Sequence, residues 1–333
     1  FVFWGHRREK IMREIEITQK DEGQRLDKML QRYLNKAAKS FVYKMLRKKN
    51  IKLNGKKAGG SEKLKAGDRI SLYLAEETIE KFREELKISK QEIPLDVIYE
   101  DANVLIINKP YGVLSQKAKK EDASINEQIV PYAVSKGLLT KKDLEMVKPS
   151  ICNRLDRNTT GILLAGISME GLKTMAELLK QRKLDKYYVC LVKGEIQKKK
   201  KISGYLVKDE KKNKVTVRQD RKEKEAYIET WYEPMEAKNG YTLLRVKLMT
   251  GKTHQIRAHL ASEGYPLVGD PKYGNPKENA YMRKEFGLRG QLLHCGEICF
   301  PSEMNGCREL QGREFRASLP LMVRRRMVRG SPS

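Results

Sequence analysis

The hydrophobic pattern near the start of the chain predicts a small unit of helices and strands. In residues 24–34 apolar side chains recur every three to four positions, which predicts an amphipathic helix. A second helix is expected over residues 41–49, with Ser40 as its N-cap. An Asn-Gly pair at 54–55 lies between extended runs and predicts a hairpin, and residues 66–74 predict a turn followed by an alternating strand.

From residue 93 onward the pattern becomes rich in strands. Strands are expected over residues 97–99, 104–107, 187–192, 226–231 and 241–248, a basic hairpin over 202–218, and helices over 169–182 and 253–262, the last capped by Thr253. This irregular alternation predicts an α+β fold: a mixed, mostly antiparallel sheet flanked by helices, preceded by a small α/β unit.

Length and local composition predict the domain layout. A chain of 333 residues has about the length of two domains. We expect an N-terminal extension (1–14), a small domain (15–75), a charged linker (76–92), a larger domain (93–320) and a basic tail (321–333). No apolar run approaches the roughly 18 residues needed to cross a bilayer, which excludes a membrane-spanning protein.

Charge then indicates the class of partner. The chain has 69 Lys and Arg against 43 Asp and Glu, a formal net charge of +26, which favours a polyanionic partner such as nucleic acid. Residues 41–57 carry seven basic side chains and no acid, which favours a phosphate-binding surface. The predicted RNA contacts there are Lys44, Arg47, Lys48, Lys49, Lys52 and Lys56.

The five cysteines favour free thiols. Their number is odd and the chain start has no secretory signal, so we expect reduced thiols and a cytoplasmic location. His294, Cys295, Cys299 and Cys307 are candidate zinc ligands, but their spacing lacks a paired CxxC. Buried thiols and no metal are therefore expected.

Asp156 is the first candidate for chemistry. It lies between Arg154 and Arg157, directly before the apolar run 162–165. Flanking guanidinium groups favour the ionised carboxylate, which serves as a nucleophile or a base. A structural ion pair ahead of a strand is the alternative, and spacing alone favours that alternative.

Two further segments carry polar side chains. In residues 250–260, His254 and Arg257 are three positions apart and are expected on one side of a short helix. His259 follows His254 by five positions, which is not a metal-ligand spacing on a helix, so structural or RNA-contacting roles are favoured. In the strand 187–192, Tyr187 and Tyr188 are expected on opposite faces.

Two resemblances give these segments an interpretation. Residues 25–28, 47–49, 51–56 and 64–70 resemble the S-four domain, a small RNA-binding domain first named for a ribosomal protein. Seven later segments, in this order, resemble the RluA-type family of RNA pseudouridine synthases, especially its C/D branch, which acts on the large ribosomal subunit: 99–114, 153–166, 186–194, 250–260, 264–274, 292–295 and 315–320.

The family resemblance implies roles for single residues. Asp156 matches the catalytic aspartate, Tyr188 the tyrosine that stacks on the target base, and Arg257 the residue that ion-pairs with the aspartate. Arg154 matches an arginine that holds the flipped-out nucleotide, and His254 is also expected to bind substrate.

Gln255 completes the predicted substrate-binding set. One departure lies in the aspartate motif, where Asn153 stands in place of the family's usual His and leaves the contacts of that loop open.

The resemblance implies an isomerase that converts uridine to pseudouridine in large-subunit ribosomal RNA, after flipping the base. No cofactor is expected, because the reaction needs neither redox change nor an outside atom. We expect no protein partner and a monomer. The alternatives are a transfer-RNA pseudouridine synthase and a non-catalytic RNA-binding assembly factor. DNA binding is disfavoured, because no helix-turn-helix or finger signature is present.

Overall fold

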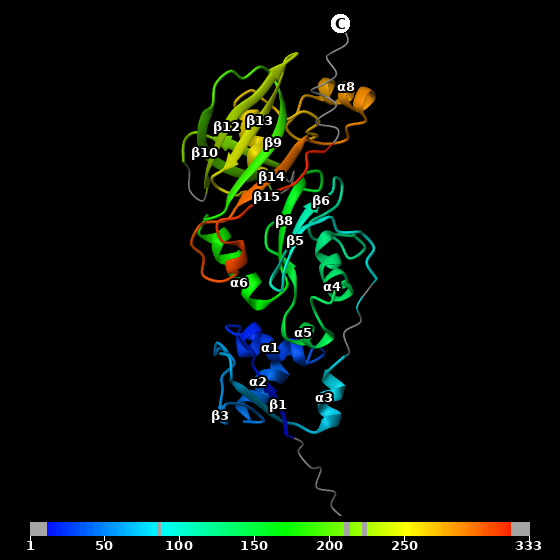
Figure 1. Cartoon of the computed structure of the whole chain (residues 1–333), viewed down its shortest axis with the longest axis vertical. Coiled ribbons are helices and arrows are strands. Elements are labelled where there is room, and N and C mark those ends of the chain that lie inside the picture. Colours follow the sequence, from blue (N-terminus) through cyan, green and yellow to red (C-terminus); the bar gives the residue numbers. More distant parts are fainter. Residues whose placement is uncertain (1–11, 85–87, 89, 210–213, 222–224, 321–333) are drawn as a thin grey trace, which may run out of the picture.

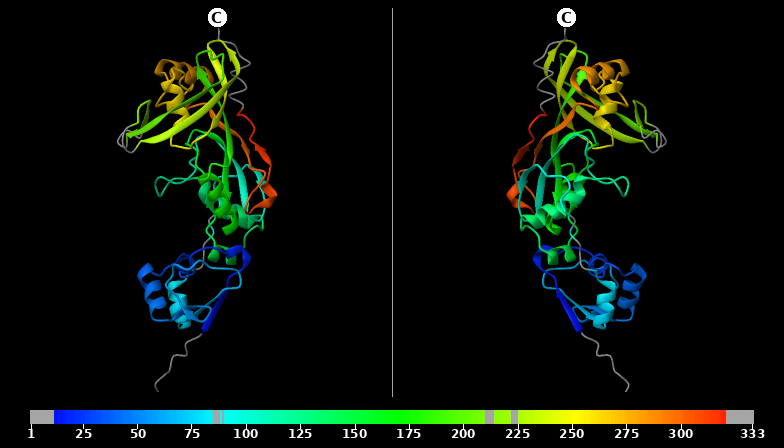
Figure 2. Two further views of the ribbon diagram at one scale, coloured as in Figure 1. Left: turned by 90° about the vertical axis from the view of Figure 1, so that its left-hand side faces the viewer. Right: turned by 90° about the vertical axis from the view of Figure 1, so that its right-hand side faces the viewer.

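The computed structural model describes residues 12–84, 88, 90–209, 214–221 and 225–320. The molecule is elongated, with a small N-terminal unit at one end and a larger unit built on one long sheet (Figure 1). Each unit has its own main hydrophobic cluster. In profile the molecule is curved, and the loop between strand β6 and helix α4 projects into the concave side (Figure 2).

The N-terminal unit is a four-stranded antiparallel sheet with helices packed on it. Its strands are ordered β1-β4-β2-β3. Its elements are β1 (Met12–Glu16), η1 (Gln19–Asp21), α1 (Leu26–Tyr33), α2 (Lys39–Arg47), β2 (Ile51–Leu53), β3 (Lys56–Lys57), β4 (Arg69–Tyr73) and α3 (Glu76–Phe82).

Local sequence explains these elements. The predicted apolar stripe of α1 is buried, including Leu26, Met29 and Leu30. Asn54 and Gly55 have positive φ angles of 49° and 72°, as the tight β2–β3 turn requires.

Three boundaries differ from expectation. Helix α2 begins at Lys39, with Ala38 and not Ser40 at its N-cap, because Ala38 still has an extended backbone and the helical backbone begins at the next residue. Strand β1 begins inside the expected N-terminal extension, because it pairs along its length with β4. Helix α3 occupies the start of the expected linker, because Ile79 buries its side chain in the N-terminal core.

The larger unit is built on an 11-stranded mixed sheet. Its main path runs β11-β10-β12-β13-β9-β14-β8-β6-β5, with β15 on β14 and β7 on β8. The strands are β5 (Val97–Glu100), β6 (Val104–Lys109), β7 (Ser150–Ile151), β8 (Thr160–Gly166), β9 (Asp185–Lys193), β10 (Lys200–Asp209), β11 (Lys214–Arg218), β12 (Ala226–Lys238), β13 (Tyr241–Leu248), β14 (Leu293–Cys299) and β15 (Glu314–Arg316). Among these strands only β14 and β8 pair in parallel, which confirms the predicted fold class.

Helices α4 (Ile125–Ser135) and α6 (Met169–Lys180) flank this sheet, and α5 (Lys141–Met146) lies between it and the N-terminal unit (Figure 1). The other helices of the larger unit are α7 (Gln255–Ser262), α8 (Pro276–Phe286) and the short η2 (Arg308–Leu310). None of them, nor any other described helix, is long and apolar enough to span a lipid bilayer.

Strand β8 is the fully buried centre of the larger unit. At its start, Gly161 has a φ of 101°, and a Cβ there would lie 2.1 Å from the carbonyl oxygen of Cys295. Glycine is therefore required for the close approach of β14. Next to it, Thr160 Oγ1 lies 2.8 Å from Nδ1 of His294. This pairing fixes the end of the loop that carries Asp156.

The two units touch through α5. Met146 buries its side chain in the N-terminal cluster. Arg32 of α1 donates hydrogen bonds to the Met146 carbonyl and, at 3.0 Å, to Oε1 of Gln24. Arg83 forms an ion pair with Glu145. The interface between the units therefore combines apolar burial with charge pairing.

Candidate active site

The Asp156 loop forms part of a pocket of about 850 Å³. The other walls come from the loop after β6, the end of α6, the start of β9 and the β13–α7 connection. Eight lysine and arginine side chains line this pocket against two carboxylates, Asp156 and Asp185. Such a lining suits an anionic substrate such as a nucleic-acid backbone.

Asp156 is held by Arg257. Nη1 of Arg257 donates a 2.6 Å hydrogen bond to Oδ2 of Asp156, joining residues 101 positions apart. The Asp156 carboxylate stays 28% exposed, so a substrate can reach it. Although burial alone would lower the pKa of Arg257, the hydrogen bonds and charges of Asp270 and Asp156 raise it above its usual value. Arg257 is therefore a permanent cation in this site.

Asp270 is a site residue that sequence reasoning missed. It is fully buried and binds Arg257 in two places, from Nε at 2.7 Å and from Nη2 at 2.9 Å. It also accepts the backbone N–H groups of Lys272 and Tyr273. Burial would raise the pKa of Asp270, but these bonds and the Arg257 charge outweigh it and lower the pKa. The only available signal was the segment 264–274, which matched the family without indicating a role.

His254 also lies close to Asp156. Its Nε2 is 3.9 Å from Oδ2 of Asp156, and its Nδ1 is 2.9 Å from the hydroxyl of Tyr273. Burial is the main reason that the pKa of His254 lies below its usual value. The expected cap at Thr253 is wrong, because His254 is itself the N-cap, in the left-handed conformation with φ of 54°, and α7 begins at Gln255.

Gln255 closes the turn before α7. Its Oε1 accepts the Thr250 hydroxyl at 2.9 Å and the Lys252 N–H at 3.1 Å. Its Nε2 donates to the Glu229 carbonyl and to the Thr230 hydroxyl. Although Gln255 lines the pocket, a direct contact with substrate requires one of these bonds to break.

Tyr188 and Tyr187 lie on opposite faces of β9, which confirms the predicted alternation. Tyr188 is buried and lines the pocket. Tyr187 lies on the other face, with the Arg245 guanidinium 3.8 Å from its ring centroid. Burial, followed by contact with Cys295, raises the pKa of Tyr188 well above its usual value. Its phenol therefore stays protonated at neutral pH.

The Asp156 loop is anchored by its neighbours. Oδ1 of Asn153 accepts the Leu164 N–H at 2.7 Å, which ties the loop to β8. Ser115 accepts the Leu155 N–H and donates back to the Leu155 carbonyl. Asn153, which replaces the family's usual His, thus has a structural contact. Arg154 stays exposed at the pocket wall.

Lys109 is a second residue that sequence reasoning missed. It is fully buried, and its Nζ donates to the carbonyls of Pro110, Val113 and Arg157 at 2.7–2.9 Å. Burial lowers its pKa to about 7, against the opposing charge of Asp156. Lys109 therefore joins the loop after β6 to the Asp156 loop. Its position at the end of an apolar run was the available signal.

The predicted RNA-binding side chains lie on α2, directly after it, and on the β2–β3 hairpin, where the register places Lys52 and Lys56 on opposite faces. All are exposed except Lys52, which is half-buried with Nζ 4.9 Å from the Tyr73 ring centroid. None of the six forms an ion pair with an acid in the described part of the chain. The set is Lys44, Arg47, Lys48, Lys49, Lys52 and Lys56.

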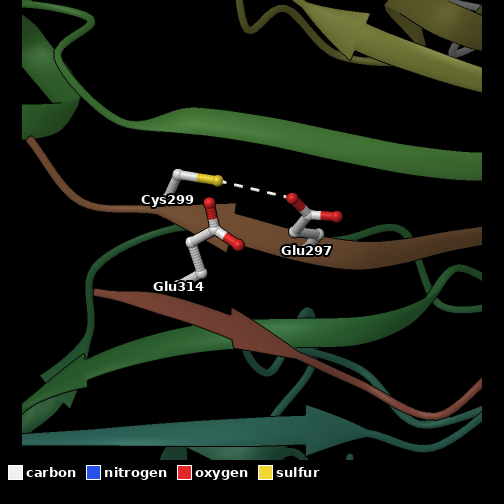
Figure 3. Close-up of side chains that lie close together, drawn as sticks. All are labelled: Glu297, Cys299 and Glu314. Carbon is white, nitrogen blue, oxygen red and sulfur yellow. Dashed lines mark hydrogen bonds between the residues drawn. The ribbon is translucent and has the colours of Figure 1, made fainter. Parts of the chain in front are cut away.

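The candidate zinc ligands do not gather in one place. His294 binds Thr160 and the Ala317 carbonyl, and the cysteines are free thiols. Cys299 lies instead beside Glu297 and Glu314 at the β14–β15 edge (Figure 3). Both arginines near this group, Arg245 and Arg316, already pair with Glu297. The cluster is therefore explained as a surface ion-pair network.

Comparisons with known proteins agree with this arrangement. A family model described as RNA pseudouridylate synthase matches residues 103–262. The chain is 31% identical over 293 residues to an uncharacterized RNA pseudouridine synthase of Aquifex aeolicus, covering 85% of this chain and 86% of that protein. It is 30% identical over 300 residues to ribosomal large subunit pseudouridine synthase C of Vibrio parahaemolyticus, covering 87% and 89%. The solved structure of human RNA Pseudouridylate Synthase Domain Containing 4 is similar in fold, with a TM-score of 0.54 at 21% identity over 68% of this chain and 90% of that one.

Proposed function

Because this chain belongs to the RNA pseudouridylate synthase family, we propose that it isomerises specific uridines of large-subunit ribosomal RNA to pseudouridine. The observation that carries the proposal is the Asp156 carboxylate, partly exposed in a basic pocket and bound on one side by Arg257. The buried ring of Tyr188 lines the same pocket.

The chemistry fits within one nucleotide. The bond from ribose C1′ to uracil N1 breaks, a bond from C1′ to C5 forms, C5 loses a proton and N1 gains one. No atom or electron comes from outside. Asp156 supplies the carboxylate that assists cleavage of the glycosidic bond. Tyr188, neutral and buried, supplies a flat wall that retains the detached base while it turns.

The target uridine must leave its stack to reach Asp156. Extrusion of a base costs a few kcal/mol. Arg154 is exposed beside Asp156, and its planar guanidinium is suited to fill the vacated position and to contact phosphate. The basic pocket lining adds attraction for the phosphates on either side.

The choice of ribosomal RNA rests on the relatives and on the N-terminal unit. Several relatives carry the name ribosomal large subunit pseudouridine synthase C or D. Residues 15–75 act as the S-four-like anchor in this proposal, residues 93–320 as the catalytic domain. The six basic side chains of the N-terminal unit bind RNA phosphates at a distance from the modified base. The enzyme acts as a cytoplasmic monomer.

Pseudouridine mapping tests the proposal. Unmodified ribosomal and transfer RNA are incubated with the protein, treated with a carbodiimide that leaves a stable adduct on pseudouridine, and read by primer extension. We expect new stops in large-subunit RNA with the intact protein and none with Asp156→Ala. Asp185→Ala is the matched control, because it removes the other carboxylate of the pocket and should keep the stops. Stops with Asp156→Ala would contradict the assigned chemistry, and stops confined to transfer RNA would replace the proposed substrate.

The anchor is tested by the salt dependence of RNA binding. Each duplex phosphate that the protein no longer binds should reduce the slope of log K against log salt by about 0.9. Changing Lys44, Lys48 and Lys49 together to Gln should therefore flatten the slope. The matched control changes Lys277, Arg283 and Lys284 on α8, which are also exposed. Equal slopes for both variants would exclude the anchor role.

A further inference from the structure

The hydroxyl of Tyr273 joins strand β11 to His254. The backbone N–H of Val215 donates to this hydroxyl at 2.9 Å, and the same oxygen lies 2.9 Å from Nδ1 of His254. The amide occupies an oxygen lone pair, so the hydroxyl proton is available to Nδ1. Nδ1 is then the acceptor, and the neutral imidazole carries its proton on Nε2.

That Nε2–H faces the reactive carboxylate. Nε2 lies 3.9 Å from Oδ2 of Asp156, and the His254 side chain is only 8% exposed. Arg257 donates to the same Oδ2. Within the part of the chain that the structure describes, Oδ1 of Asp156 has no hydrogen-bond partner. Both neighbouring nitrogens thus lie nearest to Oδ2, and Oδ1 has neither contact.

The backbone of His254 supports a specific role. Its φ of 54° is uncommon for a residue with a Cβ, and such conformations persist where the surroundings impose them. Here the conformation places the imidazole between Tyr273 and Asp156. A histidine that served only as a helix cap would need neither contact.

We propose that Tyr273 and His254 form a positioning pair that orients the Asp156 carboxylate, so that Oδ1 is the oxygen presented to the uridine. The inference rests on the proposed function and adds two positioning residues to it. Tyr273 fixes the tautomer of His254, and His254 together with Arg257 fixes the rotation of the carboxylate. Gln255, by contrast, is engaged with the backbone and does not reach Asp156.

Charged groups surround the pair on several sides. Asp156 and Asp270 favour a protonated His254, whereas burial, Arg257 and Lys272 oppose it. Arg257 and Lys214 each lie 5.3 Å from the Tyr273 ring centroid. Burial raises the pKa of Tyr273, so its hydroxyl keeps the proton that it donates.

Tyr273→Phe removes only the hydroxyl and keeps the ring. Without the donor, Nδ1 of His254 is free to take a proton, and the imidazolium would pair with Asp156. The pKa of His254 should therefore rise, and both tautomers of its neutral form should be populated. A purely structural Tyr273, holding β11 to α7, would change stability without changing His254.

The decisive measurement is nitrogen NMR of the full protein with labelled histidine. The chain has four histidines, and His254→Gln identifies the signal of interest. We expect the Nε2–H tautomer in the wild type, and a mixture with a higher pKa in Tyr273→Phe. Tyr281→Phe, on α8, is the matched control and should leave the signal unchanged. The same tautomer and titration in Tyr273→Phe and wild type would overturn the proposal.

Kinetics give the second readout. A misplaced carboxylate should lower kcat by roughly ten- to a hundredfold in Tyr273→Phe and in His254→Ala, with KM for RNA little changed. His254→Gln keeps an N–H near the Nε2 position and should recover part of the loss. The acid limb of the kcat profile should move to higher pH in Tyr273→Phe. Unchanged kcat in both variants would overturn the proposal, whereas a wild type inactive on every RNA would refute the proposed function and leave the NMR result standing.

Discussion

Replacing Asp270 by Asn should reveal how much of the active site depends on a residue that never meets the substrate. The carboxylate is fully buried and accepts four hydrogen bonds, two from Arg257 and two from backbone N–H groups. Asn has nearly the same shape. One of its polar atoms, however, must be an NH2 group, which would face an N–H of Arg257 or of the backbone.

The magnitude follows from these contacts. A hydrogen bond to a charged group contributes about 1.5–3 kcal/mol, and a donor left facing a donor in a buried site adds a further cost. Asp156 stays as a partner for Arg257 and limits the loss. We therefore expect Asp270→Asn to lower the free energy of unfolding by about 3 kcal/mol. Arg257 then has Asp156 as its one remaining carboxylate partner and should shift the position of the Asp156 carboxylate. We expect this shift to lower kcat, while RNA affinity stays near that of the wild type.

Urea unfolding and release of tritium from RNA containing 5-tritiated uridine measure the two effects. Asp96→Asn is the control, because the Asp96 carboxylate binds Asn108 at the surface.

The pH dependence of stability gives a further test. The pKa of Asp270 is lowered in the folded protein, so the ionised carboxylate stabilises the fold above the ordinary Asp pKa of about 3.9. This contribution to the free energy of unfolding is lost as pH falls through the folded pKa. The stability gap to the variant should therefore close below pH 4 or so. Equal stability and equal kcat at pH 7 would refute the reasoning.

Substitutions at three other positions test separate contacts. Tyr188→Phe keeps the aromatic wall and should leave kcat and KM close to those of the wild type, whereas Tyr188→Ala should raise KM; equal KM values for Tyr188→Ala and the wild type in tritium-release kinetics would contradict a stacking role. Lys109→Met leaves three carbonyls without their donor and should cost about 3 kcal/mol in urea unfolding. The pKa of Lys109 falls to about 7 on folding, so between this value and the unfolded value of about 10.4 the unfolded chain binds the proton more tightly than the folded protein. The wild type should therefore gain stability over this variant as pH rises through that range, and a constant difference would count against the lowered pKa. Gly161→Ala places a Cβ against the Cys295 carbonyl at a positive φ and should cost at least about 2 kcal/mol in thermal unfolding, whereas Gly240→Ala, also at positive φ but with open space around its Cβ, should cost less.

The regular elements were largely readable from the sequence. The apolar stripe of α1, the Asn54-Gly55 turn and the strand β13 follow from local patterns. Helix α8 carried clear signals, with Asn275 as cap, Pro276 at its first position and Gly287 at its end, yet its mostly polar surface hid the helical period. Helix α4 was missed because its apolar residues spread over several faces and Pro131 lies inside it.

The active site was only partly readable. Spacing alone favoured a structural ion pair at Asp156, and the family resemblance was needed to connect it with Arg257. The hydrogen bond between them joins residues 101 positions apart in the sequence, and a local pattern predicts no contact between residues so far apart. Asp270 and Lys109 were missed for the same reason, because each is defined by contacts that only the folded chain brings together.

The docking of α5 against the N-terminal unit gives the enzyme a fixed reach. Two domains joined only by a flexible tether sample many separations, and the tethered site then acts on any uridine that the tether permits. Here the Met146 side chain is buried in the N-terminal core and Arg32 binds the Met146 carbonyl. The fold therefore fixes the distance between the basic side chains of the N-terminal unit and Asp156. In the proposed function the fold therefore sets the distance between the bound RNA segment and the active site. Once the N-terminal unit has bound its RNA, the uridine that is modified is the one that lies at this distance from the bound segment.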